Sequence, residues 1–239
     1  MCGRFIVSYT YDELLGFLQS NYDISGFDLD YSENYNISPG QPILSVIKTT
    51  TEYKVGYIDW GFIPPFAKDK KSSFKMSNAR SETIKEKNSF KESFKKRRSL
   101  ILASGYYEWE RKEIKQPYVI KKTSNDLFAF AAIWTVNKLV NEKPVYTTAM
   151  LTKESDDLLS DIHNRMPVIL SYEDSLVWLN DNSTDEQLNE IVSRSSHNGF
   201  HKFKVSNFVN KSSNNGLQCI EPIWWSVLII FYRNKYIYK

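Results

Sequence analysis

The feature that most constrains the fold of this chain is a series of short β-rich segments that are not separated by helices of regular length. They cover residues 43–49, 53–60, 99–103, 105–110, 117–122, 127–134, 145–151, 166–170 and 203–206. No regular strand and helix alternation and no internal repeat is present, which argues against a parallel α/β fold and a solenoid. We therefore predict an α+β protein: a single compact domain with a curved antiparallel or mixed, barrel-like β-sheet core flanked by helices.

Helices are expected at residues 10–21, 89–96, 155–160, 171–180 and 184–192. Thr10 with Glu13 forms a capping-box pattern, and similar patterns open the last two helices. Residues 23–42 read as a long loop, and the turn at 50–52 is expected to pair the two strands beside it. Phe90 and Phe94, spaced i, i+4, are expected to face the core.

Composition excludes several classes of protein. Among 239 residues, 41% are hydrophobic and the formal net charge is only +3, so a nucleic-acid surface would require local clustering of charge. Two cysteines make no disulfide framework, and with three histidines they leave little material for a zinc site, so no metal or cofactor is expected.

The two ends of the chain lack a membrane or export signal. No secretory signal pattern is present at the start. The apolar run 223–232 is shorter than the about 20 residues that span a bilayer. We expect one domain over residues 1–222, an apolar tail of unknown role at 223–239, no membrane contact, and a cytoplasmic or, in a eukaryote, nuclear location.

Cys2 is the first candidate for chemistry. Removal of Met1 would leave it with a free α-amine, whose pKa of about 7.7 to 8.0 keeps a fraction of the free base at neutral pH. Such an amine forms an imine with an aldehyde, and the thiol then closes a five-membered thiazolidine by an intramolecular step. Residues 1–5 alone favour the other interpretation, a cysteine that is buried at position 2 by chance.

Three further segments carry polar groups suited to a site. Residues 77–83 combine an amide, a guanidinium and hydroxyls that suit a phosphate or sugar, although a helix start capped by Ser81 fits equally well. Glu108 lies among aromatic residues, where desolvation would raise its pKa toward the range of a general acid. His163 and Arg165 precede an apolar strand, where a structural histidine is the commoner case.

Two other segments allow two interpretations each. The basic run 85–98 suits a nucleic-acid backbone or is simply a solvated helix face. The apolar loop 60–66 suits stacking on exposed bases or packs under the domain. His197 lies in a polar stretch that indicates nothing specific, and Cys219 is expected to be buried and inert.

Taken together, the order of these motifs resembles the SOS response associated peptidase (SRAP) family of abasic site processing proteins. The matching segments are residues 1–5, 35–40, 60–69, 77–83, 105–109, 163–170 and 205–222. One departure lies in the aromatic loop, where Phe66 replaces the usual tryptophan.

The resemblance implies that Cys2 traps abasic sites in single-stranded DNA as a thiazolidine crosslink and so protects them. It implies a catalytic set of Cys2, Asn78, Glu108 and His163, and DNA contacts from Arg4, Pro39, Arg80, Thr83, Thr152 and Arg165. Asn78 would orient the Cys2 amine, Glu108 would transfer protons, and His163 would stabilise the sugar. The implied partner is single-stranded DNA with abasic sites, bound by a monomer.

Two rival functions remain open. An N-terminal cysteine peptidase or amidase would use the Cys2 thiolate as nucleophile and the α-amine as base. A non-covalent single-stranded DNA binding module would show salt-sensitive binding that is indifferent to the abasic site.

Overall fold

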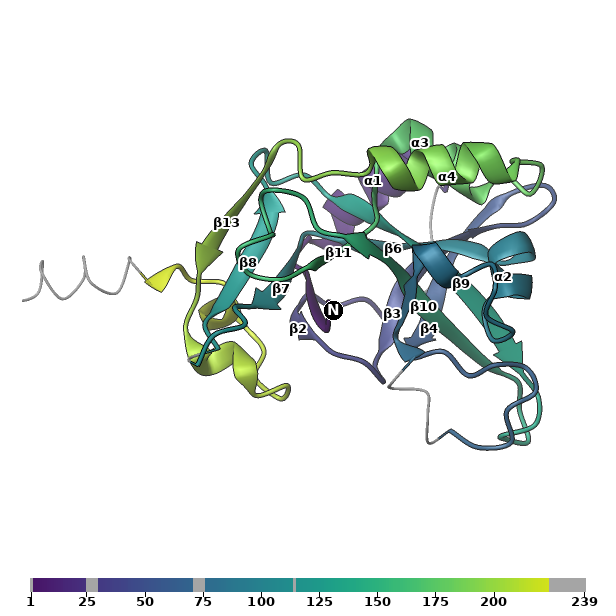
Figure 1. Cartoon of the computed structure of the whole chain (residues 1–239), viewed down its shortest axis with the longest axis horizontal. Helices are drawn as coiled ribbons and strands as arrows, with labels where there is room; N and C mark the ends of the chain where they lie inside the picture. Colours follow the sequence, from purple (N-terminus) through teal and green to yellow (C-terminus); the bar gives the residue numbers. More distant parts are fainter. Residues whose placement is uncertain (1, 25–29, 71–75, 114, 224–239) are drawn as a thin grey trace, which may run out of the picture.

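The computed structural model describes residues 2–24, 30–70, 76–113 and 115–223, which form two β-sheets and the helices around them (Figure 1). The smaller sheet is antiparallel, in the order β13, β8, β7, β1, β2. Its strands are β1 (Arg4–Val7), β2 (Asn34–Ile37), β7 (Gly105–Trp109), β8 (Pro117–Lys122) and β13 (Phe200–Lys204).

The larger sheet is mixed and closes on itself. Its strands are β3 (Pro42–Lys48), β4 (Tyr53–Trp60), β5 (Asn78–Arg80), β6 (Arg98–Ala103), β9 (Phe128–Asn137), β10 (Val145–Glu154), β11 (Arg165–Pro167) and β12 (Ile169–Leu170). Because β10 pairs with both β4 and β9, the strands β10, β4, β3, β6 and β9 form a ring. This ring confirms the barrel-like α+β core predicted from the sequence.

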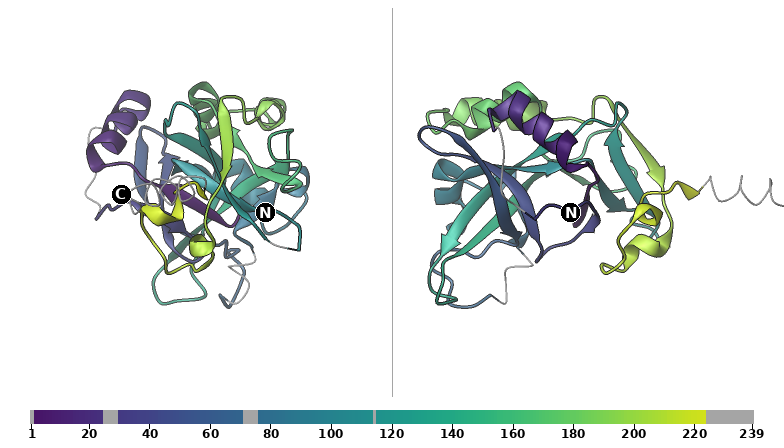
Figure 2. Two further views of the ribbon diagram at one scale, coloured as in Figure 1. Left: turned by 90° about the vertical axis from the view of Figure 1, so that its left-hand side faces the viewer. Right: turned by 180° about the vertical axis from the view of Figure 1, so that it is seen from behind.

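Helices α1, α3 and α4 lie together at one end of the molecule (Figures 1 and 2). The helices are α1 (Tyr11–Tyr22), α2 (Lys91–Lys96), α3 (Tyr172–Leu179) and α4 (Asp185–Arg194), with 3₁₀ turns η2 (Ser81–Thr83), η3 (Asn207–Asn210) and η4 (Leu217–Cys219). Thr10 caps α1 through the expected reciprocal bonds with Glu13, which confirms the capping box.

Strand β6 of the larger sheet is buried on both faces. Along β6, Leu100 and Leu102 pack in a cluster with the helices, whereas Ile101 and Ala103 pack in a second cluster with residues of the smaller sheet. The alternation follows the two-residue period of a strand. Cys2 belongs to the second cluster, so it lies in the apolar layer between the two sheets.

The structure corrects several predicted elements. The sequence patterns missed strands β1, β2 and β5, and β2 interrupts the loop expected over 23–42. Residues 155–160 form turns, because the Asp156 carboxylate binds His197 and does not cap a helix. The strand expected over 166–170 divides into β11 and β12, and β13 begins before residue 203.

The other predicted strands and helices are present within a few residues of the expected bounds, and Phe90 and Phe94 are buried as predicted. The tail from 224 onward lies outside the described residues. Within the described part of the chain, no helix is both long and apolar enough to cross a bilayer.

Candidate active site

Cys2 is placed by the pairing of β1 with β7. The antiparallel register sets Arg4 opposite Tyr107 and Phe5 opposite Tyr106. Cys2, just before β1, is fully buried in the same apolar cluster as Phe5 and Tyr106. Its thiol lies 3.7 Å from the Arg4 carbonyl oxygen.

Glu108 lies beside Cys2 and is almost completely buried, at 2% exposure. Its Oε1 atom has no hydrogen-bond partner among the described residues. Burial raises the pKa of this carboxyl to about 7, because the apolar surroundings disfavour the charged form. The sequence-based expectation of a raised pKa is therefore confirmed, and Glu108 holds and releases a proton near neutral pH.

The Cys2 thiol does not readily ionise to a thiolate in this environment. Burial, and secondarily the neighbouring Glu108 carboxyl, raises the pKa of the Cys2 thiol well above its usual value. A nucleophilic cysteine needs the opposite shift, which nearby positive charge provides in thiol enzymes. The thiol of Cys2 therefore remains protonated until another group accepts its proton.

Asn78 reaches Cys2 from the larger sheet. Strand β5 pairs in parallel with β10, with Asn78 opposite Met150. The Asn78 Nδ2 group donates a hydrogen bond to the Cys2 carbonyl oxygen at 2.9 Å and a second to Ser77 Oγ at 3.2 Å. Its buried Oδ1 atom accepts no hydrogen bond from the described residues, so an acceptor remains available beside Cys2.

His163 lies in a turn before β11 and is 6% exposed. Its Nε2 atom is 2.7 Å from Nη2 of Arg111, and its Nδ1 atom is 2.9 Å from the backbone nitrogen of Arg165. An imidazolium carries N–H groups on both nitrogens and would meet a donor on each side. Burial is the main cause that lowers the pKa of His163 to about 4, so the ring is neutral at physiological pH.

Arg111 is a site residue that the sequence analysis missed. It lies just after β7, is exposed, and lowers the pKa of both His163 and Glu108 by its positive charge. Its positive charge therefore acts on both groups. Its position within a charged loop gave no sequence signal.

A group of polar residues, which we call the polar edge, adjoins this buried cluster: Arg80, Glu82, Thr83, Thr152 and Arg165. Arg165 makes a bidentate ion pair with Glu82, at 2.6 and 2.9 Å, and donates to the Thr152 carbonyl oxygen at 2.7 Å. Arg80 lies opposite Thr152 in the pairing of β5 with β10 and is exposed. The Thr83 hydroxyl is buried and has no partner within the described residues.

Arg4 and Pro39 lie apart from that polar edge. The Arg4 guanidinium donates to Asn36 Oδ1 and the Val209 carbonyl oxygen, each at 2.7 Å, and to the Asn210 carbonyl oxygen at 3.1 Å. These bonds hold the C-terminal segment against the smaller sheet. Pro39 is half-buried in the turn between β2 and β3. The DNA contacts expected of these residues and of the polar edge remain predictions.

The apolar loop 60–66 was expected either to stack on exposed bases or to pack under the domain, and its residues differ in this respect. Trp60, Phe62 and Ile63 are buried in the core, whereas Phe66 is 62% exposed. Only Phe66 therefore has the accessible ring that stacking on a base requires.

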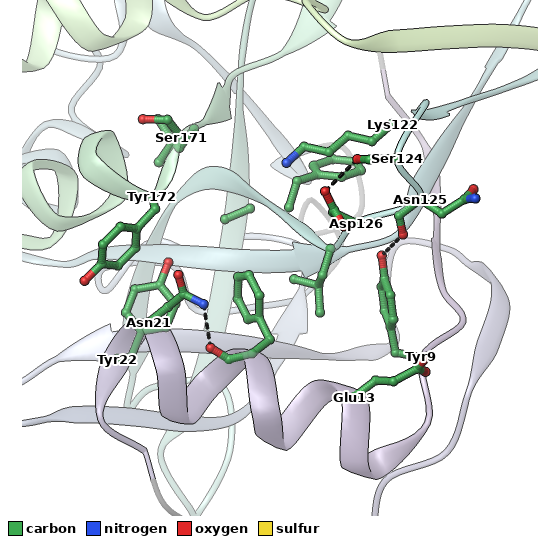
Figure 3. A pocket seen from close by; sticks show the side chains of 15 residues that line it. Tyr9, Glu13, Asn21, Tyr22, Lys122, Ser124, Asn125, Asp126, Ser171 and Tyr172 are labelled. Carbon is green, nitrogen blue, oxygen red and sulfur yellow. Dashed lines mark hydrogen bonds between the residues drawn. The ribbon is translucent and has the colours of Figure 1, made fainter.

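A cavity of about 610 Å³ lies outside the set of predicted site residues (Figure 3). It is bounded by α1, by the turn between β8 and β9, and by the start of α3. Tyr9 crosses its rim to the Asn125 carbonyl oxygen, and Lys122 and Asp126 add opposite charges. None of the predicted site residues lines it.

Known proteins match this chain over most of its length. A family model described as SOS response associated peptidase (SRAP) matches residues 1–212. The chain is 38% identical to the abasic site processing protein YoqW of Bacillus subtilis, over 92% of this chain and 99% of the relative. It is 27% identical to the abasic site processing protein YedK of Escherichia coli, over 93% of this chain and 100% of the relative.

Further matches include a vertebrate protein and a solved structure. The chain is 33% identical to the abasic site processing protein HMCES of Pongo abelii, over 81% of this chain and 66% of the relative. A crystal structure of a protein from Bacteroides thetaiotaomicron superposes with a TM-score of 0.79 at 22% identity, over 92% of this chain and 99% of that chain. The latter likeness shows the fold.

Proposed function

This chain belongs to the SOS response associated peptidase (SRAP) family, and from that premise we propose that it forms a covalent thiazolidine crosslink between Cys2 and abasic sites in single-stranded DNA. The crosslink protects the site from strand scission. The observation that carries the proposal is the meeting of three groups from separate strands. Asn78 bonds to the main chain of Cys2, and Glu108, which is buried and has one oxygen without a partner among the described residues, lies near Cys2.

The chemistry begins with the amine. After Met1 has been removed, the free amine of Cys2 attacks the aldehyde carbon of the ring-opened deoxyribose and forms a carbinolamine. Loss of water, assisted by a proton from Glu108, gives an iminium ion. The thiol sulfur then attacks the same carbon and its proton leaves to a base, so the net reaction joins aldehyde and aminothiol with release of one water.

The order of amine and thiol follows from the local electrostatics. Burial keeps the thiol protonated, which disfavours the thiolate attack that a cysteine peptidase requires. Attack by the thiol on a preformed iminium is intramolecular and gains from proximity. Neutral His163 suits a hydrogen bond to a sugar hydroxyl, because a neutral ring has both a donor and an acceptor nitrogen.

The DNA backbone would follow the polar edge. Arg80, Thr83 and Arg165 lie near one another on β5, η2 and β11, and they supply the guanidinium and hydroxyl groups that bind phosphates. Arg4 and Pro39, which lie apart from that edge, are proposed to extend the path. Thr152 is fully buried and is proposed to support the path through its bond to Arg165. Binding as a monomer is part of this proposal.

The first experiment compares Cys2→Ala with Cys219→Ala. Both cysteines are buried and unpaired, so Cys219 provides a matched control. Mature protein is incubated with single-stranded DNA that contains one abasic site, then analysed by denaturing gel and intact mass spectrometry. The wild type and Cys219→Ala should give a crosslink and Cys2→Ala should give none; a crosslink in Cys2→Ala contradicts the proposal.

The same samples distinguish the rival functions. Retention of Met1 should block the crosslink, because the α-amine is then a peptide nitrogen. Hydrolysis of a peptide in the absence of DNA would favour the peptidase. Salt-sensitive binding without an adduct, equal for intact and abasic DNA, would favour a non-covalent binding module.

A further inference from the structure

Three side chains near Cys2 form a hydrogen-bonded network that the proposed chemistry does not use. Tyr106 Oη is 2.5 Å from Nε2 of His197, and His197 Nδ1 is 2.7 Å from Oδ1 of Asp156. Tyr106 is completely buried, His197 is 5% exposed, and the Asp156 side chain reaches the surface at 29% exposure. Sequence reasoning assigned His197 nothing, because its neighbours along the chain are polar.

Asp156 fixes the direction of the hydrogen bonds. Its second oxygen accepts the His197 backbone N–H at 2.7 Å, so the carboxylate holds both the main chain and the ring of His197. A carboxylate only accepts, so His197 Nδ1 carries the ring proton and Nε2 is left as an acceptor. The Tyr106 hydroxyl therefore donates to His197, and burial keeps it protonated by raising its pKa.

The two ends of this hydrogen-bonded network lie on the elements that carry Glu108 and His163. Tyr106 is two positions before Glu108 on β7, so the two side chains share one face of the strand. Asp156 begins the turn segment that ends at His163, where Leu159 N–H bonds to the Asp156 carbonyl oxygen and His163 N–H to the Leu159 carbonyl oxygen. His197 therefore connects the strand of Glu108 to the turn of His163.

We propose that Tyr106, His197 and Asp156 are positioning residues that hold the His163 turn at a fixed place relative to Glu108 and Cys2. The inference rests on the proposed function, since it assigns the three residues a role in that reaction. Glu108 lies on β7 of the smaller sheet and His163 in the turn before β11 of the larger sheet, and a buried hydrogen-bonded network is directional where apolar packing is not. The network thus fixes the geometry in which Cys2 attacks the sugar, whereas the polar edge determines the affinity for DNA.

Tyr107 offers a matched control for Tyr106. It is buried on the opposite face of β7, and its hydroxyl also makes a short hydrogen bond, to the Tyr35 carbonyl oxygen at 2.6 Å. It packs with Val119, Val205 and Cys219 in a third cluster, away from Cys2. The Tyr107 hydroxyl also lies 3.4 Å from the Cys219 carbonyl oxygen. Removing either hydroxyl takes the donor from a buried or half-buried acceptor, so the two variants should lose stability to a similar degree.

The test measures the single-turnover crosslinking rate at saturating abasic DNA and the DNA concentration that gives half of that rate. Tyr106→Phe should react about tenfold more slowly at saturation with an unchanged half-saturating concentration, whereas Tyr107→Phe should match the wild type. Equal rates for Tyr106→Phe and Tyr107→Phe, at equal thermal stability, overturn the inference. If the wild type itself forms no crosslink, the proposed function fails instead.

Two substitutions of His197 provide a second, independent test. The amide of Gln reaches the position of Nε2, so His197→Gln keeps an acceptor for Tyr106, whereas the amide of Asn reaches only the position of Nδ1. His197→Gln should retain more of the saturating rate than His197→Asn, and Tyr106→Phe combined with His197→Asn should be no slower than either single variant. Equal rates for the two His197 variants, or additive losses in the double variant, contradict a shared positioning role.

Discussion

Glu82 and Glu108 are glutamates of the same site, but their surroundings act on their charges in opposite directions. Glu82 is exposed and forms a bidentate ion pair with Arg165, which holds the pKa of its carboxyl below the usual value. Glu108 is buried without a partner for Oε1 among the described residues, and its pKa is raised to about 7. The comparison shows that the pKa of a carboxyl rises toward neutral where burial outweighs the nearby positive charge, and falls where an ion pair dominates.

The largest expected difference between the two glutamates is in the rate of crosslinking. Glu108→Gln keeps the shape of the side chain but removes the proton donor, so the rate should fall about 10²- to 10⁴-fold, whereas Glu82→Gln should stay within a few-fold of the wild type. The wild-type rate should also rise with pH up to about 7, as the Cys2 amine loses its proton, and fall above about 8, where the amine is already free and Glu108 continues to lose its proton. The fall should be absent in Glu108→Gln. Single-turnover rates between pH 5 and 9 measure both effects; a similar loss of rate in the two variants would break the comparison.

The next effect is on stability and has opposite signs at the two positions. Because folding raises the pKa of Glu108, this residue favours the folded state most below its ordinary value of 4.5, and the advantage is lost as pH rises through about 7. Glu108→Gln should therefore unfold like the wild type near pH 4 and be more stable by up to about 3 kcal/mol at pH 8.

Glu82→Gln is the matched variant for the same denaturant titrations. Glu82 has a lowered pKa, so its contribution is present above the usual glutamate range and is lost as pH falls. Its removal should cost less than about 1 kcal/mol at pH 8, as is usual for an exposed ion pair. A stabilised Glu82→Gln, or a destabilised Glu108→Gln at pH 8, would reverse the assignment of the two environments.

The smallest effect concerns DNA affinity. Glu82 neutralises Arg165, so Glu82→Gln should strengthen binding of an unmodified single-stranded oligonucleotide a few-fold and steepen its salt dependence by about one unit of log-log slope. Arg165→Gln should do the reverse, and Glu108→Gln should leave the slope unchanged. Fluorescence anisotropy titrations at several salt concentrations measure the slopes. If neither Glu82→Gln nor Arg165→Gln changes the slope, Arg165 does not contact the DNA backbone.

Long, strongly patterned elements were predictable from the sequence, and the short strands that build the site were not. The hairpin of β3 and β4 and the capped helix α1 depend on neighbouring residues, so local patterns reveal them. Strands β1 and β5 have four and three residues and exist because distant strands pair with them. Non-local pairing leaves no periodicity to read.

The same distinction separates the site residues. Cys2, Asn78, Glu108 and His163 were identified through a family resemblance, and the structure brings the first three into one buried cluster, with His163 linked to it through Arg111. Arg111 and His197 were missed, because each acquires its role from a partner more than 40 residues away. Their neighbours in the sequence are ordinary surface residues.

The complete burial of Cys2 has a consequence for the order of events during protein synthesis. Removal of Met1 needs an accessible N-terminus, but β1 becomes enclosed only when its partner β7, about 100 residues later in the chain, has been made. At about 5 to 20 residues per second, the ribosome leaves an interval of several seconds in which the nascent end is open. Removal of Met1 from the proposed nucleophile is thus expected to occur on the ribosome, before Cys2 becomes buried.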